Sequence, residues 1–160
     1  MPGASPPTGR SIIAVDVAVS ATVASPLSRA EAERLARAVL RAEEVQNAML
    51  SVAFVGRRRI RSLNRRHFGL DRETDVVAFS LVGVRGLVVG DVYCAPEVAS
   101  RQARTFGSSP REEMQRVVVH GVLHVLGYDH PGLSGRVSSP MWRRQERLLA
   151  RLAGRRSRSG

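Results

Sequence analysis

Three histidines in the C-terminal third of the chain have the residue type and spacing of a metal site. His120 and His124 lie four residues apart, so their imidazoles share one face if the segment is helical. Gly127 is a residue type that ends helices, and the turn after it lets His130 return towards the same point. Three imidazoles that leave a fourth position open to water are typical of a catalytic zinc ion. The alternative, two core histidines and an unrelated loop histidine, leaves the glycine and the third histidine unexplained.

This spacing is that of the metzincin proteases, with one difference at the second position. The proteases have a glutamate there, and it acts as the general base. This chain has Gly121, which carries no side chain. A zinc-bound water still reaches a pKa of about 7 without that glutamate. The sequence therefore favours metal-assisted hydrolysis with one Zn²⁺ and a zinc-bound water, and it weakens the interpretation as a metalloprotease.

The elements around the cluster predict an α/β (α+β) fold, a single domain with a small mixed four-stranded sheet and about five helices. Alternating β-branched segments predict strands over residues 11–20, 48–55, 76–82 and 87–93. Capping residues and apolar periodicity predict helices over residues 29–43, 57–66, 96–106, 110–126 and 140–152. Gly83 and Gly86 join two strands so closely that we expect an antiparallel hairpin. His120 and His124 lie on the fourth helix.

The 160 residues contain enough apolar side chains, 43%, for one well-formed core. We expect a flexible tail at residues 1–10, a single metal-dependent hydrolase domain at 11–153 and a basic disordered tail at 154–160. A single cysteine, Cys94, excludes an intrachain disulfide and suggests a reducing compartment. The first ten residues lack the apolar core of a secretion signal, and no apolar run approaches the ~20 residues that span a bilayer. We therefore expect a cytoplasmic protein with no membrane partner.

A surplus of positive charge points to a polyanionic partner. The formal net charge is +11, and every basic residue other than histidine is arginine. Such a chain attracts nucleic acid, although a generally basic proteome is an equal alternative. Residues 57–66 contain six arginines and no acid, and residues 143–158 contain seven arginines and one acid. Contact with RNA and a merely solvated surface both explain these runs.

Several motifs resemble those of one known family. His120-Gly-Val-Leu-His-Val-Leu-Gly-Tyr-Asp-His130 is similar to the signature of the YbeY-type rRNA maturation factors, which are bacterial metal-dependent endoribonucleases. Leu63-Asn64, Asp71 and the run from Thr74 to Ser80 are similar to the family's LN…D…TDVLSF block. Gly90-Asp91-Val92 with Pro96-Glu97, and Met141 with Gln145-Glu146, resemble its two remaining blocks. The matches cover roughly residues 60 to 148 in the family's order.

The resemblance implies a zinc-dependent endoribonuclease that acts on single-stranded RNA. It further implies a role in 3′-end maturation of small-subunit (16S) rRNA and in ribosome quality control, with the ribosomal small subunit and assembly factors as partners. By position, His120, His124 and His130 are the implied ligands. The family commonly has an arginine where this chain has Phe68. Arg65 or Arg66 is then the candidate for the phosphate contact.

Asp129, next to His130, has two interpretations. It is either a carboxylate that orients a ligand histidine or a turn-forming residue after Gly127. A non-catalytic, metal-stabilised ribosome-assembly factor is an alternative function of the whole chain. The sequence specifies neither the RNA cleavage site nor the oligomeric state, and three imidazoles also accept nickel, cobalt or copper.

Overall fold

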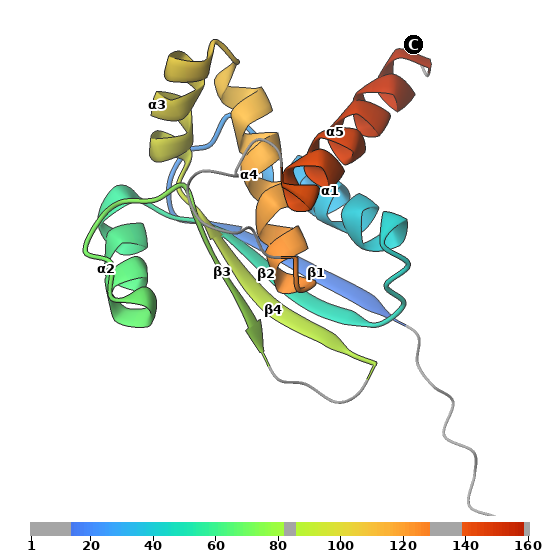
Figure 1. Cartoon of the computed structure of the whole chain (residues 1–160), viewed down its shortest axis with the longest axis horizontal. Helices are drawn as coiled ribbons and strands as arrows, with labels where there is room; N and C mark the ends of the chain where they lie inside the picture. The colour runs from blue at the N-terminus through green and yellow to red at the C-terminus, as the bar shows by residue number, and fades with distance from the viewer. Residues whose placement is uncertain (1–13, 82–85, 129–138, 159–160) are drawn as a thin grey trace, which may run out of the picture.

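The computed structural model describes residues 14–81, 86–128 and 139–158. Within these ranges the chain forms a four-stranded sheet and five helices (Figure 1). In chain order the elements are β1 (Val15–Ala21), α1 (Arg29–Ala42), β2 (Ala48–Phe54), α2 (Arg57–Phe68), β3 (Val76–Leu81), β4 (Val88–Cys94), α3 (Pro96–Phe106), α4 (Pro110–Val125) and α5 (Pro140–Arg158).

The sheet is mixed, as predicted, with the strand order β1-β2-β4-β3. β2 pairs in parallel with β1 on one side and with β4 on the other. A parallel pair needs a crossover connection, and α1 supplies the one between β1 and β2. β3 pairs with β4 in antiparallel orientation, with Val76 opposite Cys94. This confirms the predicted hairpin and places β3 at one edge of the sheet.

The main core lies between one face of the sheet and the helices α1 and α4. Alternate strand residues such as Leu50, Val52 and Val92 face this core and are almost completely buried. In Figure 1, α4 lies across the sheet, where it contacts β3 and β4, and α5 packs against α4. α2 lies beside β3, where a smaller cluster forms around Ile60 and Val77. Val77 follows Val76 in β3, so this cluster is on the opposite face of the sheet.

Two glycines let α4 approach the sheet closely. A Cβ atom at Gly121 would lie 2.4 Å from Cγ1 of Val92, and one at Gly90 would lie 2.3 Å from Cγ1 of Val125. Carbon atoms do not approach to such distances without displacement. Glycine at these two positions therefore brings the histidine-bearing part of α4 directly onto β4.

Most element boundaries agree with the sequence predictions to within two or three residues. The capping box at the start of α1 is confirmed, since Ser28 and Glu31 each accept from the other's backbone amide. α5 is longer than predicted: it continues to Arg158, so residues 154–158, expected in a disordered tail, are helical. Arginine is a good helix former, which accounts for this extension. The predicted tail at residues 1–10 lies outside the described residues. None of the described helices is long and apolar enough to cross a membrane.

Candidate metal centre

The helix α4 carries the two central histidines, and its start is defined by local sequence. Ser109 is the N-cap: its side-chain oxygen accepts a hydrogen bond from the backbone N–H of Glu112 at 3.1 Å. Pro110 occupies the first helical turn, where no backbone N–H is needed. Gly127 follows the helix with φ +98°, a left-handed conformation that side chains disfavour. The helix therefore ends where the sequence predicted it.

His120 and His124 lie one helical turn apart and face the same side of α4. Their ring centroids are 4.7 Å apart, and their planes cross at 76°. Both side chains are half-buried, so the pair is accessible from one side. Two imidazoles in this arrangement are able to bind one cation together, because zinc accepts histidine nitrogens at about 2.0–2.1 Å.

A buried amide orients the first of these rings. The Nδ1 atom of His120 lies 2.9 Å from Oε1 of Gln145 on α5, and only 2% of Gln145 is exposed. An amide oxygen only accepts hydrogen bonds, so Nδ1 of the imidazole carries the proton and donates it. In the neutral ring the lone pair is then on Nε2. This is the arrangement in which histidine ligates metals while its other nitrogen is held by a protein acceptor.

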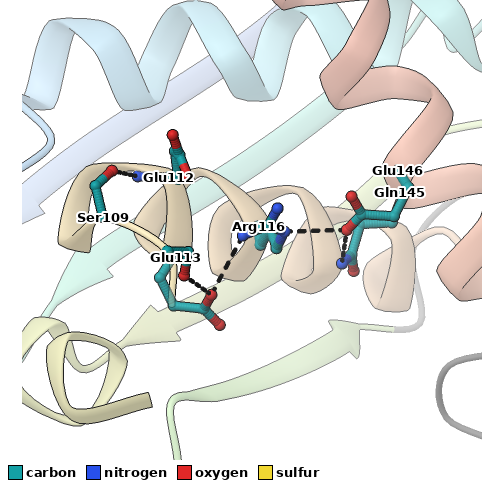
Figure 2. A network of polar contacts seen from close by, with 7 residues as sticks. Ser109, Glu112, Glu113, Arg116, Gln145 and Glu146 are labelled. Carbon is teal, nitrogen blue, oxygen red and sulfur yellow. Dashed lines mark hydrogen bonds and ion pairs between the residues drawn. The ribbon is translucent and has the colours of Figure 1, made fainter. Parts of the chain in front are cut away.

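The orientation of the Gln145 amide is itself set by a chain of polar contacts along α4 (Figure 2). Nε2 of Gln145 donates to Oε1 of Glu146 at 3.4 Å, and Nε of Arg116 donates to the same oxygen at 3.1 Å. Arg116 also pairs with Glu113 at 3.5 Å. Since the amide NH₂ points to Glu146, the amide oxygen is left to face His120.

The chain leaving α4 is attached to two other helices. The hydroxyl of Tyr128 donates to Oε2 of Glu43 at 2.8 Å, and Arg144 on α5 donates to Oε1 of the same carboxylate at 2.5 Å. The hydrogen bond to Glu43 and partial burial raise the pKa of Tyr128 above its ordinary value. Tyr128 therefore packs against the core and anchors the end of this segment, one residue before Asp129.

The donor set in the described part of the chain fits a zinc ion in part. His120 and His124 are two nitrogen ligands on one face, and the first has its tautomer set for ligation. The third predicted ligand, His130, and the adjacent Asp129 lie outside the described residues. Among the residues that the structure describes, no group of three or more metal-ligating side chains is present. The predicted site thus depends on His130 for its third nitrogen.

The structure gives a physical reason for the missing protease base. Gly121 faces the sheet, where a Cβ atom would also lie 3.1 Å from Cγ2 of Val76. A glutamate at this position would have to displace β3 and β4 before its carboxylate reached any solvent. The position after the first histidine therefore serves close packing, and no side chain at this position supplies a base.

The candidate arginines lie on a different element from the histidines. Arg65 and Arg66 are exposed on α2, and no described contact joins either to His120 or His124. Phe68, which stands where the family commonly has arginine, stacks on Phe79 with ring centroids 5.9 Å apart. Phe68 therefore contacts β3 through Phe79 and supplies no charged group at the position where the family commonly has arginine.

Burial shows the role of Cys94, and two residues of the site carried little or no sequence signal. Cys94 is completely buried at the end of β4, and burial raises the pKa of its thiol. It acts as a small core residue. The role of Gln145 was not predicted; the only signal was its place in the Met141…Gln145-Glu146 motif. Arg116 carried no sequence signal, because its ion pair with Glu146 crosses between two helices.

Comparison with known proteins found matches to a single family description. The family model described as Endoribonuclease YbeY matches residues 18–153. A protein named Endoribonuclease YbeY from Pelotomaculum thermopropionicum is 40% identical over 127 residues, which cover 74% of this chain and 82% of the relative. A protein of the same name from Thermotoga maritima is 32% identical over 112 residues, or 70% of this chain and 73% of the relative.

The fold is also similar to a solved structure. The solution structure of a Thermotoga maritima protein superposes with a TM-score of 0.58 at 26% sequence identity. The match covers 89% of this chain and 93% of that protein. The sequence and structure comparisons therefore both extend over nearly the whole of the described domain.

Proposed function

The chain belongs to the Endoribonuclease YbeY family, and on that premise we propose that it is a metal-dependent endoribonuclease that cuts single-stranded RNA. We further propose that His120, His124 and His130 hold the metal, one zinc ion. The biological substrate in this proposal is the 3′ end of small-subunit rRNA, with the ribosomal small subunit and its assembly factors as partners in the cytoplasm.

One observation supports the metal assignment above all others. His120 and His124 lie side by side on one face of α4 while a buried amide oxygen accepts from Nδ1 of His120. Histidines that ligate metals almost always donate their other ring nitrogen to a protein acceptor, and Gln145 provides that acceptor for His120. The buried Gln145 is explained if Nε2 of His120 must present its lone pair to a cation.

Each group of the proposed site has a separate role in the reaction. When bound, zinc supplies a Lewis acid for phosphate and lowers the pKa of water, which is the chemistry that phosphodiester hydrolysis needs. Gln145 orients His120, and Tyr128 anchors the segment that leads to Asp129 and His130. Arg65 or Arg66 is the proposed phosphate contact, since guanidinium matches a phosphate in bidentate fashion. The net charge of +11 favours a polyanionic substrate.

The test combines metal analysis with cleavage. We expect the purified chain to contain about one zinc per molecule and to cut a defined single-stranded RNA, with cleavage abolished by a chelator and restored by zinc. His124→Ala is expected to lose both zinc and cleavage but to keep its far-UV circular dichroism spectrum.

His67→Ala is the matched control, because His67 is an exposed histidine on α2 that contacts Phe79 rather than the α4 pair. It should bind zinc and cut RNA as the unmodified chain does. Equal RNA cleavage by His124→Ala would contradict the proposal. Chelator-sensitive cleavage of an unfolded protein substrate would instead support a metalloprotease, and stoichiometric zinc without any RNA cleavage would support a non-catalytic assembly factor.

A further inference from the structure

The six arginines of α2 are sorted into two groups by their partners. Arg57 pairs with Glu97 at 3.2 Å and with Glu73 at 3.8 Å, and Arg61 pairs with Asp71 at 2.9 Å. Within the described parts of the chain, the other four side chains make no ion pair and no hydrogen bond, although all are exposed. These four are Arg58, Arg59, Arg65 and Arg66.

The second group occupies one side of the helix. At 100° per residue, these four positions fall within an arc of about 120°. Ile60, Leu63 and Asn64, the buried residues of α2, lie on the opposite side. α2 carries no acidic residue of its own. The outward arc is therefore a stripe of four guanidinium groups. Arg58 and Arg59 form one end of it, and Arg65 and Arg66, seven residues or about two helical turns later, form the other.

The distribution of acids around α2 makes this stripe specific. Glu97 pairs with Arg57, Asp71 pairs with Arg61, and Glu73 pairs with Arg57 and with Arg101 of α3, so the ion pairs around α2 lie on the flank that carries Arg57 and Arg61. Four guanidinium groups without an ion pair to a described carboxylate offer a row of charged donors to an external anion, and phosphate is the anion that guanidinium binds in bidentate fashion.

We propose that Arg58, Arg59, Arg65 and Arg66 form a binding surface for the phosphate backbone of an RNA strand. This inference rests on the proposed function, because it takes RNA rather than an acidic protein as the polyanion. β3 is the edge strand of the sheet, with α2 and α4 both in contact with it (Figure 1). Val76 of β3 lies against Gly121, next to His120. α2 and the histidine-bearing part of α4 therefore both lie beside the same edge strand.

The test measures binding without cleavage. In the His124→Ala background, the affinity for a fluorescein-labelled oligouridylate is measured by anisotropy at several salt concentrations. Changing all four arginines to glutamine should raise the dissociation constant at least ~10-fold near 0.1 M salt. It should also make the plot of log K against log salt shallower by about 0.7 for each phosphate group that the protein no longer binds, so by nearly ~3 in all.

A matched variant separates the stripe from net charge. Arg29, Arg34 and Arg41 of α1 and Arg147 of α5 are also exposed and make no ion pair among the described residues. Changing these four to glutamine removes the same charge, and we expect this variant to keep most of the salt dependence. Equal weakening in both variants, or unchanged binding by the α2 variant, would overturn the inference; the second outcome would leave an acidic protein as the partner of α2.

Failure of the proposed RNA-binding surface and failure of the proposed endoribonuclease activity would give different results. If the unmodified chain binds the oligouridylate through α2 but never cuts RNA, the surface stands and the endoribonuclease assignment fails. If the chain cuts RNA while the α2 variant binds it normally, the assignment stands and the surface is wrong.

Discussion

The imidazole of His120 is oriented from its far side by an amide that water does not reach. Gln145 accepts from Nδ1 at 2.9 Å, and its own NH₂ group is directed to Glu146. Partners of this kind set the tautomer and the ring orientation of ligand histidines, and their removal typically costs about 10–100-fold in metal affinity.

We therefore predict that Gln145→Leu weakens zinc binding by about 10–100-fold, because Nδ1 is left without its acceptor. The measurement is a zinc titration against a competing chelator. The double variant Gln145→Glu/Glu146→Gln keeps an acceptor at position 145 and a donor at position 146, and it should recover most of the affinity. If both variants bind zinc as the unmodified chain does, the contact is structural and does not serve the metal.

Replacing Gly121 with alanine should destabilise the fold, although replacing a helical glycine with alanine usually stabilises a protein. In an exposed helix interior, Gly→Ala stabilises by about 1 kcal/mol. Here the added Cβ would lie 2.4 Å from Cγ1 of Val92, so Gly121→Ala should destabilise the fold by about 1–3 kcal/mol. Urea unfolding measures the difference. A gain in stability would show that α4 does not lie as close to β4 as the structure has it.

At the scale of elements, α4 is connected to α1 near the beginning of both helices. Arg111, in the first turn of α4, forms an ion pair with Glu31, in the first turn of α1. The hydrogen bond from Arg111 and that from the Ser28 backbone hold the pKa of Glu31 well below its ordinary value. A carboxylate with a lowered pKa stabilises the folded state above its unfolded pKa of about 4.3, and this stabilisation is lost as the pH falls below that value.

We predict that the unmodified chain loses stability between pH 7 and pH 3 and that Glu31→Gln loses less over the same interval. Urea unfolding at several pH values measures both. Glu112→Gln is the control: Glu112 is exposed and makes no ion pair among the described residues, so this variant should follow the unmodified chain. Identical pH profiles for Glu31→Gln and the unmodified chain would show that the α1–α4 ion pair is not formed in solution.

At the scale of the whole molecule, the core is built from apolar side chains. The buried cluster joins the sheet to α1, α4 and α5 through apolar side chains such as Phe54, Leu123 and Met141. Neither His120 nor His124 belongs to this cluster. Folding is therefore expected to come from the apolar core, with metal binding adding to it by mass action.

We predict that chelator-treated protein keeps its secondary structure and unfolds cooperatively, with a lower Tm than the zinc-loaded form. A metal that binds only the folded state adds about 4 kcal/mol at a free concentration 1,000-fold above its Kd. Thermal unfolding followed by circular dichroism, with and without zinc, provides the measurement. A chain that is unfolded without metal would favour the alternative in which the metal only maintains the fold.

The sequence alone determined the local features of this protein. Ser28 with Glu31 and Ser109 with Pro110 located two helix starts, because capping depends on residues close together in the chain. The alternation of β-branched residues located the strands, and the spacing of His120 and His124 placed both on one helical face. The family was also accessible from the sequence, since its motifs are short and follow one another in order.

Only the tertiary structure decided which distant residues meet. Gln145 and Arg116 act on the candidate site across two helices, and Gly121 is required by the approach of α4 to Val92. The arginines of α2 were equivalent in the sequence, and the positions of Asp71, Glu73 and Glu97 divide them into two groups. The physical reason is common to all three cases: local spacing sets the direction of a side chain on its own element, whereas its partners depend on how the elements pack together.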